Sequence, residues 1–285
     1  MPVRILALIA LAAFAGGYGV VRLAHGHVPG AREAAVAQVL LAGAPDVVAE
    51  PVATSSEPTA GAPGNVRVPI LVYHIVRPSY PSDSAAVRAL AVTPETFDAE
   101  LAHLASAGYR VVPLAALESS LASSTPLPAK PVVITLDDGW EDQYQYAFPI
   151  LRAHGDPATF FVFTNAIGRK GFFTWSELKE MLAVGMSIGD HTESHPYLTR
   201  LSLAKQQQEI LGARAILERG LGVSIREFAY PFGLHDATTT AILSAAGFAA
   251  ARDDGGSPLQ SLAKIYTLGS MNAPTTTAAF DRWFP

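Results

Sequence analysis

The stretch Val132-Val-Ile-Thr-Leu-Asp-Asp-Gly-Trp140 decides how the rest of the chain is interpreted. Its first five residues are apolar or β-branched and show no polar alternation, which is typical of a strand buried on both faces of a parallel sheet. Two adjacent carboxylates, Asp137 and Asp138, follow directly. Charges at the end of such a strand are costly unless they are paired or bound to a metal ion. The stretch therefore predicts a buried strand that ends in a chemically active group.

Strand and helix signals alternate on both sides of this stretch. Further apolar runs predict strands at 69–73, 158–163, 187–190, 226–230, 248–251 and 265–268. Helix start signals recur between them, at Thr93, Thr174, Ser202 and Asp236. About seven such units over roughly 220 residues predict an α/β fold whose parallel sheet is closed, or nearly closed, into a barrel. A doubly wound open sheet is the alternative.

The N-terminal part of the chain differs in composition from the rest. Residues 1–24 contain Arg4 and an apolar run from Ile5 to Val21, which predicts a signal peptide or a membrane anchor. A buried core helix is the weaker alternative, because no polar face interrupts the run. Residues 25–65 are rich in Pro, Ala and Ser and lack aromatic residues, so they are expected to form a linker. Residues 66–285 are then the catalytic domain of an exported protein.

Composition excludes several classes of function. The chain has 20 basic and 25 acidic residues, a net charge of −5, and no long basic run. Such a balance argues against nucleic acid as a partner, because polyanion binding requires clustered positive charge. Cysteine is absent, which removes disulfides, thiolate metal sites and cysteine nucleophiles.

Polar side chains follow five of the predicted strands. His74 follows the first strand, and the remaining groups are 137–140, 190–195, 230–233 and 252–254. The carboxyl ends of the strands in a parallel barrel all lie at the same face. The five groups are therefore expected to meet at one mouth of the barrel.

The histidines in this set have the spacing of metal ligands. His191 and His195 are four residues apart and can bind one cation if the segment turns helically, although two surface histidines would show the same pattern. A carboxylate completes such a set and leaves positions open for water and substrate. One of the two adjacent aspartates can serve as this ligand, while the other takes a proton from the activated water.

Several motifs resemble those of a known family. Thr135-Leu-Asp-Asp-Gly139 resembles the T-F-D-D-G motif of the polysaccharide deacetylases, the NodB-homology carbohydrate esterases of family 4, and His191-Thr-Glu-Ser-His195 resembles their H-[ST]-x-x-H motif. Phe228-Ala-Tyr-Pro-Phe-Gly233 is similar to the F-A-Y-P-Y-G form of the branch that acts on poly-β-1,6-N-acetylglucosamine. Segments 71–76, 92–97 and 108–112 also look like that branch, so the resemblance extends from Pro69 to the C-terminus.

The resemblance implies a distorted (β/α) barrel of about seven parallel strands and a divalent metal ion, commonly zinc. By motif position, Asp138, His191 and His195 would be the metal ligands and Asp137 the catalytic base. The substrate would be an exported or cell-wall N-acetylglucosamine polysaccharide, from which the enzyme removes N-acetyl groups. The protein would act in the bacterial cell envelope, periplasmic or extracellular, with residues 5–21 as a candidate membrane tether. Substrate-binding residues would be Trp140, Tyr230, Pro231, Phe232 and Arg252.

The chain departs from the family pattern at two residue positions, and in addition the later Asp–Trp motif of the family is not found. The arginine of the third motif is replaced by Ala229, and the histidine of a later L-x-H motif, which usually acts as general acid, is replaced by Ser270. His74 is a candidate for the missing acid, and Arg252 is a candidate for the missing positive charge beside the base. A non-catalytic glycan-binding relative and an O-acetyl esterase acting on a glycan are the alternative functions.

Overall fold

The computed structural model describes residues 65–285. The predicted signal or anchor segment, 1–24, lies outside the described residues, and so does the predicted linker apart from Asn65. Among the residues described, no helix is both long enough and apolar enough to cross a bilayer.

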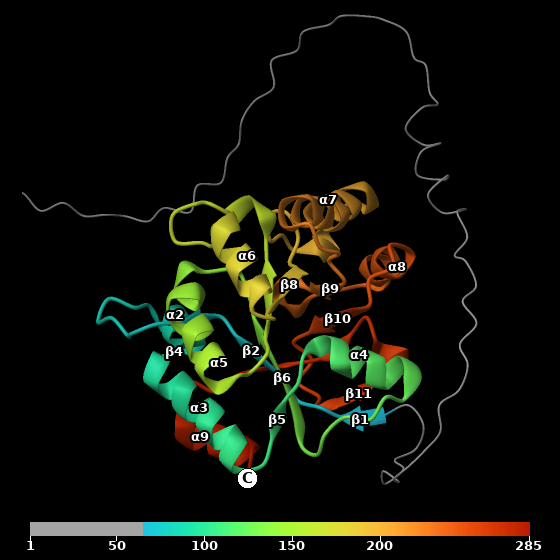
Figure 1. Cartoon of the computed structure of the whole chain (residues 1–285). Helices are drawn as coiled ribbons and strands as arrows, with labels where there is room; N and C mark the ends of the chain where they lie inside the picture. Colours follow the sequence, from blue (N-terminus) through green and yellow to red (C-terminus); the bar gives the residue numbers. More distant parts are fainter. Residues whose placement is uncertain (1–64) are drawn as a thin grey trace, which may run out of the picture. The chain divides into compact units, whose positions relative to one another are not determined.

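The centre of the fold is a parallel sheet that curves into a nearly closed barrel (Figure 1). Along its main path the order of strands is β12-β10-β9-β8-β7-β6-β2-β13, and the short strand β5 also pairs with β6. Every neighbouring pair in this sheet is parallel. The strands are β2 (Ile70–Tyr73), β5 (Arg110–Val111), β6 (Pro131–Leu136), β7 (Thr159–Val162), β8 (Ser187–Asp190), β9 (Glu227–Ala229), β10 (Ala250–Asp253), β12 (Leu268–Gly269) and β13 (Met271–Asn272).

The last two strands join the two edges of the sheet. β12 pairs with β10, β13 pairs with β2, and only Ser270 separates β12 from β13. If β12 and β13 are counted as one interrupted strand, seven strands run around the barrel along this path. The predicted α/β barrel of about seven parallel strands is confirmed, and the alternative of a doubly wound open sheet is wrong.

Helices surround the sheet (Figure 1). They are α2 (Ala85–Leu90), α3 (Pro94–Ser106), α4 (Leu114–Ser123), α5 (Phe148–His154), α6 (Trp175–Ala183), α7 (Leu203–Leu221), α8 (Ala237–Ala245) and α9 (Thr277–Trp283). The predicted start signals of α3, α6 and α8 are confirmed by their bonds: Thr93 accepts from the Thr96 N–H, Thr174 and Glu177 form a capping box, and Asp236 accepts from the Thr239 N–H.

Three features of the fold differ from the predictions. Gly220 predicts the end of helix α7 near Arg219, but the helix continues to Leu221 and is followed by Gly222, which has the left-handed conformation that ends helices. The predicted strand at 248–251 lies two residues further along, and most of the predicted strand at 265–268 is not a strand. Helix α4 was not predicted, although Leu114, Leu117 and Leu121 recur at helical spacing and are buried.

The strands of the barrel are buried on both faces, as the apolar runs predict. All four residues of β2 and of β7 are buried, and five of the six residues of β6 are buried. Two short pairs lie outside the barrel: β1 (Asn65–Arg67) is antiparallel to β11 (Leu259–Ser261), and β3 (Ile75–Val76) is parallel to β4 (Ala91–Val92). The barrel core therefore fixes the strand ends rigidly in space.

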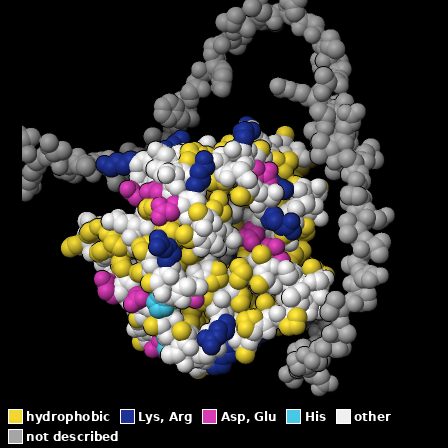
Figure 2. All heavy atoms as spheres, in the orientation of Figure 1, with side chains coloured by type: hydrophobic (Ala, Val, Ile, Leu, Met, Phe, Trp, Pro, Cys, Tyr) yellow, Lys and Arg dark blue, Asp and Glu magenta, His cyan; other side chains and the backbone are white. Residues whose placement is uncertain are grey.

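The segment between β3 and β4 projects from the barrel as an arm that includes α2 (Figures 1 and 2). Helix α2 has no buried residue, and Tyr80 and Leu90 of the arm are exposed. At the base of the arm, Arg77 donates hydrogen bonds to both carboxylate oxygens of Asp83. Elsewhere on the face drawn in Figure 2, basic and acidic side chains are interspersed.

A pair of acidic residues is buried away from the carboxyl ends of the strands. Glu227, the first residue of β9, is 6% exposed and accepts a hydrogen bond of 3.1 Å from the Thr159 hydroxyl. Burial raises the pKa of Glu227 to about 8, and the carboxyl of Glu118 on α4 adds to the shift. Burial likewise raises the pKa of Glu118 to about 7. The folded protein therefore favours the protonated form of both groups near neutral pH.

This burial predicts a pH-dependent stability. A carboxyl whose pKa is raised on folding stabilises the folded state below its unfolded pKa, and this contribution is lost as the pH rises through the folded pKa. Between about pH 5 and pH 8, each such group lowers the free energy of unfolding by up to about 1.4 kcal/mol per pH unit. We expect Glu227→Gln to flatten this decline, as measured by urea denaturation across the range. The exposed Glu141→Gln is the control, and equal slopes for Glu227→Gln and wild type would contradict the assignment.

Candidate functional site

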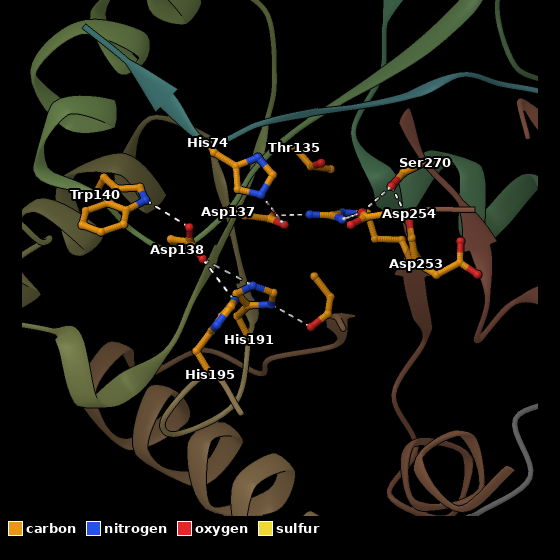
Figure 3. A network of polar contacts seen from close by, with 12 residues as sticks. His74, Thr135, Asp137, Asp138, Trp140, His191, His195, Asp253, Asp254 and Ser270 are labelled. Atoms are coloured by element: carbon orange, nitrogen blue, oxygen red, sulfur yellow. Dashed lines mark hydrogen bonds and ion pairs between the residues drawn. The ribbon is translucent and has the colours of Figure 1, made fainter. Parts of the chain in front are cut away.

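The polar groups that follow the strands meet at one mouth of the barrel, as predicted (Figure 3). Asp138, in the turn after β6, places its Oδ1 atom 3.6 Å from Nε2 of His191 and 3.3 Å from Nε2 of His195. The ligand atoms of these three residues all lie within 4.8 Å of one another. The structure thus brings together the three residues predicted as metal ligands.

The turn after β6 aims Asp138 into the mouth. Asp138 and Gly139 both have the left-handed backbone conformation, with φ of 76° and 74°. A Cβ atom at position 139 would lie 2.9 Å from Cγ1 of Val162, so only glycine fits there. The indole Nε1 of Trp140 donates a 3.0 Å hydrogen bond to Oδ2 of Asp138, which leaves Oδ1 facing the histidines.

The segment that carries the two histidines is an irregular loop and not the helical turn that the four-residue spacing would have required. Thr192 and His195 have positive φ values of 76° and 58°. The buried carboxylate of Asp190 accepts from the Thr192 N–H at 2.7 Å, and the Thr192 hydroxyl accepts from the His195 N–H at 2.9 Å. Side chain to backbone bonds therefore replace a helix in bringing the two imidazoles together.

One ring nitrogen of His191 is committed to the backbone. Its Nδ1 atom lies 2.7 Å from the carbonyl oxygen of Ala229, an acceptor, so Nδ1 carries the proton. Burial alone would lower the pKa of His191, but the carboxylates of Asp138 and Asp137 outweigh it and raise this pKa. Once the ring is neutral, its Nε2 atom presents a lone pair to the mouth. A hydrogen bond from the ring nitrogen that does not bind the metal is the usual way in which proteins orient a metal-binding histidine.

The three residues fit a divalent metal ion. A tetrahedral ion with ligand distances of about 2.0–2.2 Å would place its donor atoms roughly 3.3–3.6 Å apart. The two carboxylate–imidazole distances, 3.3 and 3.6 Å, match this separation. Burial, and then the proximity of His191, lower the pKa of His195 to about 4, so this imidazole is neutral and able to act as a ligand.

Asp137 lies beside the cluster in a different environment. Its Oδ1 atom is paired with Nη2 of Arg252, which has no exposed surface, and its Oδ2 atom lies 4.0 Å from Nε2 of His74. Burial by itself would raise the pKa of Asp137, but the charge of Arg252, helped by His191 and His74, outweighs it and holds the pKa below its usual value. Asp137 is therefore an ionised carboxylate within reach of the ligand cluster.

The structure also places the two departures from the family motifs. Arg252 on β10 pairs in register with Ala229 on β9. The small side chain of Ala229, at the position of the arginine in the motif, therefore lies next to Arg252. Ser270, at the position of the missing histidine, is fully buried, and its hydroxyl donates to the carbonyl oxygen of Asp253. This hydroxyl is therefore not free to give a proton to a substrate.

The residues predicted to bind substrate separate into two groups. Tyr230 is 1% exposed and its hydroxyl donates to the carbonyl oxygen of Tyr266; Pro231 and Arg252 are also buried. Their side chains belong to the wall of the barrel and do not line an open surface. Trp140 and Phe232 remain at the opening, Phe232 with 47% of its surface exposed.

Two aromatic partners of these residues were missed by the sequence analysis. Phe232 stacks on Tyr197, with ring centroids 4.0 Å apart, and Trp140 stacks on Phe172, with centroids 4.5 Å apart. Each partner comes from a loop of irregular structure, where no periodic pattern marks it. Both pairs adjoin the Asp138–His191–His195 cluster, one through the Trp140–Asp138 hydrogen bond and the other through Phe232, whose ring centroid lies 4.6 Å from that of His195.

Comparisons with known proteins agree with this geometry. The model of the polysaccharide deacetylase family matches residues 124–251. YxkH of Bacillus subtilis, whose name assigns it provisionally to the polysaccharide deacetylases, is 29% identical over 198 residues, which cover 66% of this chain and 68% of YxkH. The poly-β-1,6-N-acetyl-D-glucosamine N-deacetylase of Escherichia coli K12 is 29% identical over 131 residues, covering 40% of this chain and 20% of that enzyme.

A solved structure shares the fold. The deacetylase PplD of Streptococcus pyogenes, in complex with acetate, superposes with a TM-score of 0.71 at 27% identity and covers 77% of this chain and 99% of PplD. The match extends well beyond the 128 residues of the family model and includes the barrel. In its motifs, in residues 124–251 and in its barrel, the chain is thus similar to the polysaccharide deacetylases, the NodB-homology carbohydrate esterases.

Proposed function

We propose that this protein is a metal-dependent hydrolase that removes N-acetyl groups from an N-acetylglucosamine polysaccharide. The observation that carries the proposal is the Asp138–His191–His195 cluster with the ionised carboxylate of Asp137 beside it. A site built only for binding has no need of a free base next to a metal site. The chain also lacks a cysteine and so uses no thiolate chemistry.

The choice of substrate rests on similarity to a family branch. The relative from Escherichia coli is named for poly-β-1,6-N-acetyl-D-glucosamine, and the 228–233 segment of this chain is similar to the motif of that branch. The aromatic pairs beside the cluster support a sugar substrate, because aromatic rings offer apolar faces against which pyranose rings can pack. We propose zinc as the metal, since a set of two histidines and one carboxylate suits it.

The residues of the mouth divide the reaction between them. A divalent ion bound by Asp138, His191 and His195 would polarise the acetyl carbonyl and lower the pKa of a bound water. Asp137, ionised and held by Arg252, accepts the proton of the attacking water. His74 lies 4.0 Å from Asp137 and delivers a proton to the departing amine, the role that Ser270 cannot fill.

Export is part of the proposal. The apolar run from Ile5 to Val21 supports translocation out of the cytoplasm, with or without retention as a membrane anchor. A polysaccharide of the cell envelope would be encountered there.

Two alternative functions use the same site. The same chemistry would act on an O-acetyl ester of a glycan. The buried Ser270, at the usual position of the general acid, is the feature that favours a non-catalytic relative.

The role of Asp137 can be tested by acetate release from β-1,6- and β-1,4-linked N-acetylglucosamine oligomers. We expect Asp137→Asn to lower kcat roughly 10²- to 10⁴-fold, because the general base is lost while the shape of the site is kept. The exposed Asp98→Asn is the control and should behave as wild type. Acetate release that Asp137→Asn leaves unchanged would exclude this residue as the base. No release by wild-type enzyme with metal bound would favour an O-acetylated substrate or a binding protein.

The metal site can be tested without turnover. The variant His195→Ala removes one of the three proposed ligands. We expect zinc binding to weaken at least 100-fold, as measured by chelator competition, and less than one zinc per chain to remain after dialysis, as measured by elemental analysis. His154→Ala, which removes a histidine paired with Asp98 on the surface, is the control. Equal zinc content in both variants would show that His195 is not a ligand.

A further inference from the structure

Gln143 is a buried residue close to the reacting groups that no motif includes. It has no exposed surface, and its amide Nε2 donates to two backbone carbonyls, that of His74 at 2.6 Å and that of Asp137. These carbonyls belong to the residues that directly follow β2 and β6. One side chain therefore bridges the ends of the two strands that present the proposed acid and the proposed base.

The local sequence explains why Gln143 can reach both strands. It opens a π-helical turn, η1 (Gln143–Ala147), in which the Phe148 N–H donates to the Gln143 carbonyl, five residues back. Pro149 follows, and in a regular α-helix its ring would clash with the carbonyl four residues earlier, that of Gln145. The wider turn avoids this clash. In this arrangement Asp142 and Gln143 contact the segments that follow β2 and β6.

The neighbour of Gln143 holds the other side of His74. The carboxylate of Asp142 accepts a hydrogen bond of 3.3 Å from the Val76 N–H and lies 4.0 Å from Nε of Arg77. The consecutive side chains of Asp142 and Gln143 therefore both hold the backbone of segment 74–76. The ladder between β2 and β6 ends at Tyr73 and Leu136, so His74 and Asp137 lie just beyond its regular pairing.

These contacts give Gln143 a role in the reaction. We propose that Gln143 is a positioning residue that sets the separation of His74 and Asp137 by fixing the backbone that carries each of them. The inference rests on the proposed function, in which these two residues exchange protons with the substrate and water. A buried amide is suited to this task because it donates two hydrogen bonds without adding a charge beside Asp137.

The test replaces the amide by an apolar side chain of similar length. In Gln143→Met both carbonyls lose their donor, and we expect kcat for acetate release to fall roughly tenfold to hundredfold, with KM and zinc affinity changed less than threefold. Gln145→Met is the matched control, since Gln145 is exposed on the same π-helical turn. Gln143→Asn retains the donors on a shorter arm and should lie between Gln143→Met and wild type.

A double-mutant cycle separates positioning from a general loss of structure. In the His74→Ala background, Gln143→Met should cost clearly less than in wild type, because the separation that Gln143 sets no longer matters once the imidazole of His74 is absent. Equal costs in the two backgrounds, a parallel loss of zinc affinity, or full activity of Gln143→Met would each overturn the inference. Should Gln143→Met not fold, Gln143→Asn is carried through the same cycle.

A spectroscopic measurement keeps the inference independent of the proposed substrate. The imidazole nitrogen resonances of His74 are identified by their absence in His74→Ala, and they should shift in Gln143→Met but not in Gln145→Met. This shift is expected even if wild-type protein releases no acetate, an outcome that would reject the proposed function alone. Unshifted His74 resonances in a folded Gln143→Met protein would reject the positioning role.

Discussion

The site depends on burying the positive charge of Arg252 against the negative charge of Asp137. Two adjacent carboxylates at the end of an apolar strand cannot both remain ionised in a dry environment unless each has a partner. Asp138 accepts a hydrogen bond from the Trp140 indole and would share a metal ion with the two histidines, and Asp137 has a guanidinium with no exposed surface. Arg252 also lies 3.4 Å from Asp254, so its charge is shared between the site and the wall of the barrel. Breaking such a pair leaves a buried charge uncompensated, which costs far more than the pair itself contributes.

The barrel explains how this pair can differ from the family motif without losing its position. Ala229 and Arg252 are direct partners on neighbouring parallel strands, so a side chain moved from one strand to the next stays at the same height in the wall. The guanidinium can therefore reach the same carboxylate from either strand, provided that the neighbouring position is small. Ser270 is held by the carbonyl of Asp253, one residue beyond Arg252. Strand β10, which carries Arg252, therefore lies between the two departures, Ala229 on β9 and Ser270 after β12.

Much of this arrangement could be predicted from the sequence, because it follows from the topology. Once apolar runs predict parallel strands, the residues after them must share one mouth, and His74, Asp137, Asp138, His191 and His195 do so. The partners within the mouth were harder to predict. Arg252, 115 positions from Asp137, was predicted only as a candidate charge beside the base, and the burial of Tyr230 depends on a carbonyl of a late loop. Gln143 carries no signal at all, since an amide within a polar stretch predicts exposure as readily as burial.

Backbone strain is concentrated where the chemistry is proposed to occur. Six residues other than glycine have positive φ among residues 65–285, and four of them, Asp138, Thr192, His195 and Phe232, lie at the mouth. Such conformations persist only where surrounding contacts compensate for their cost. Here the compensation is local: the Trp140 indole holds Asp138, the Thr192 hydroxyl holds the His195 N–H, and Tyr197 stacks on Phe232. The strands beneath are largely buried and form a closely packed base, and this base supports the strained backbone of the rim.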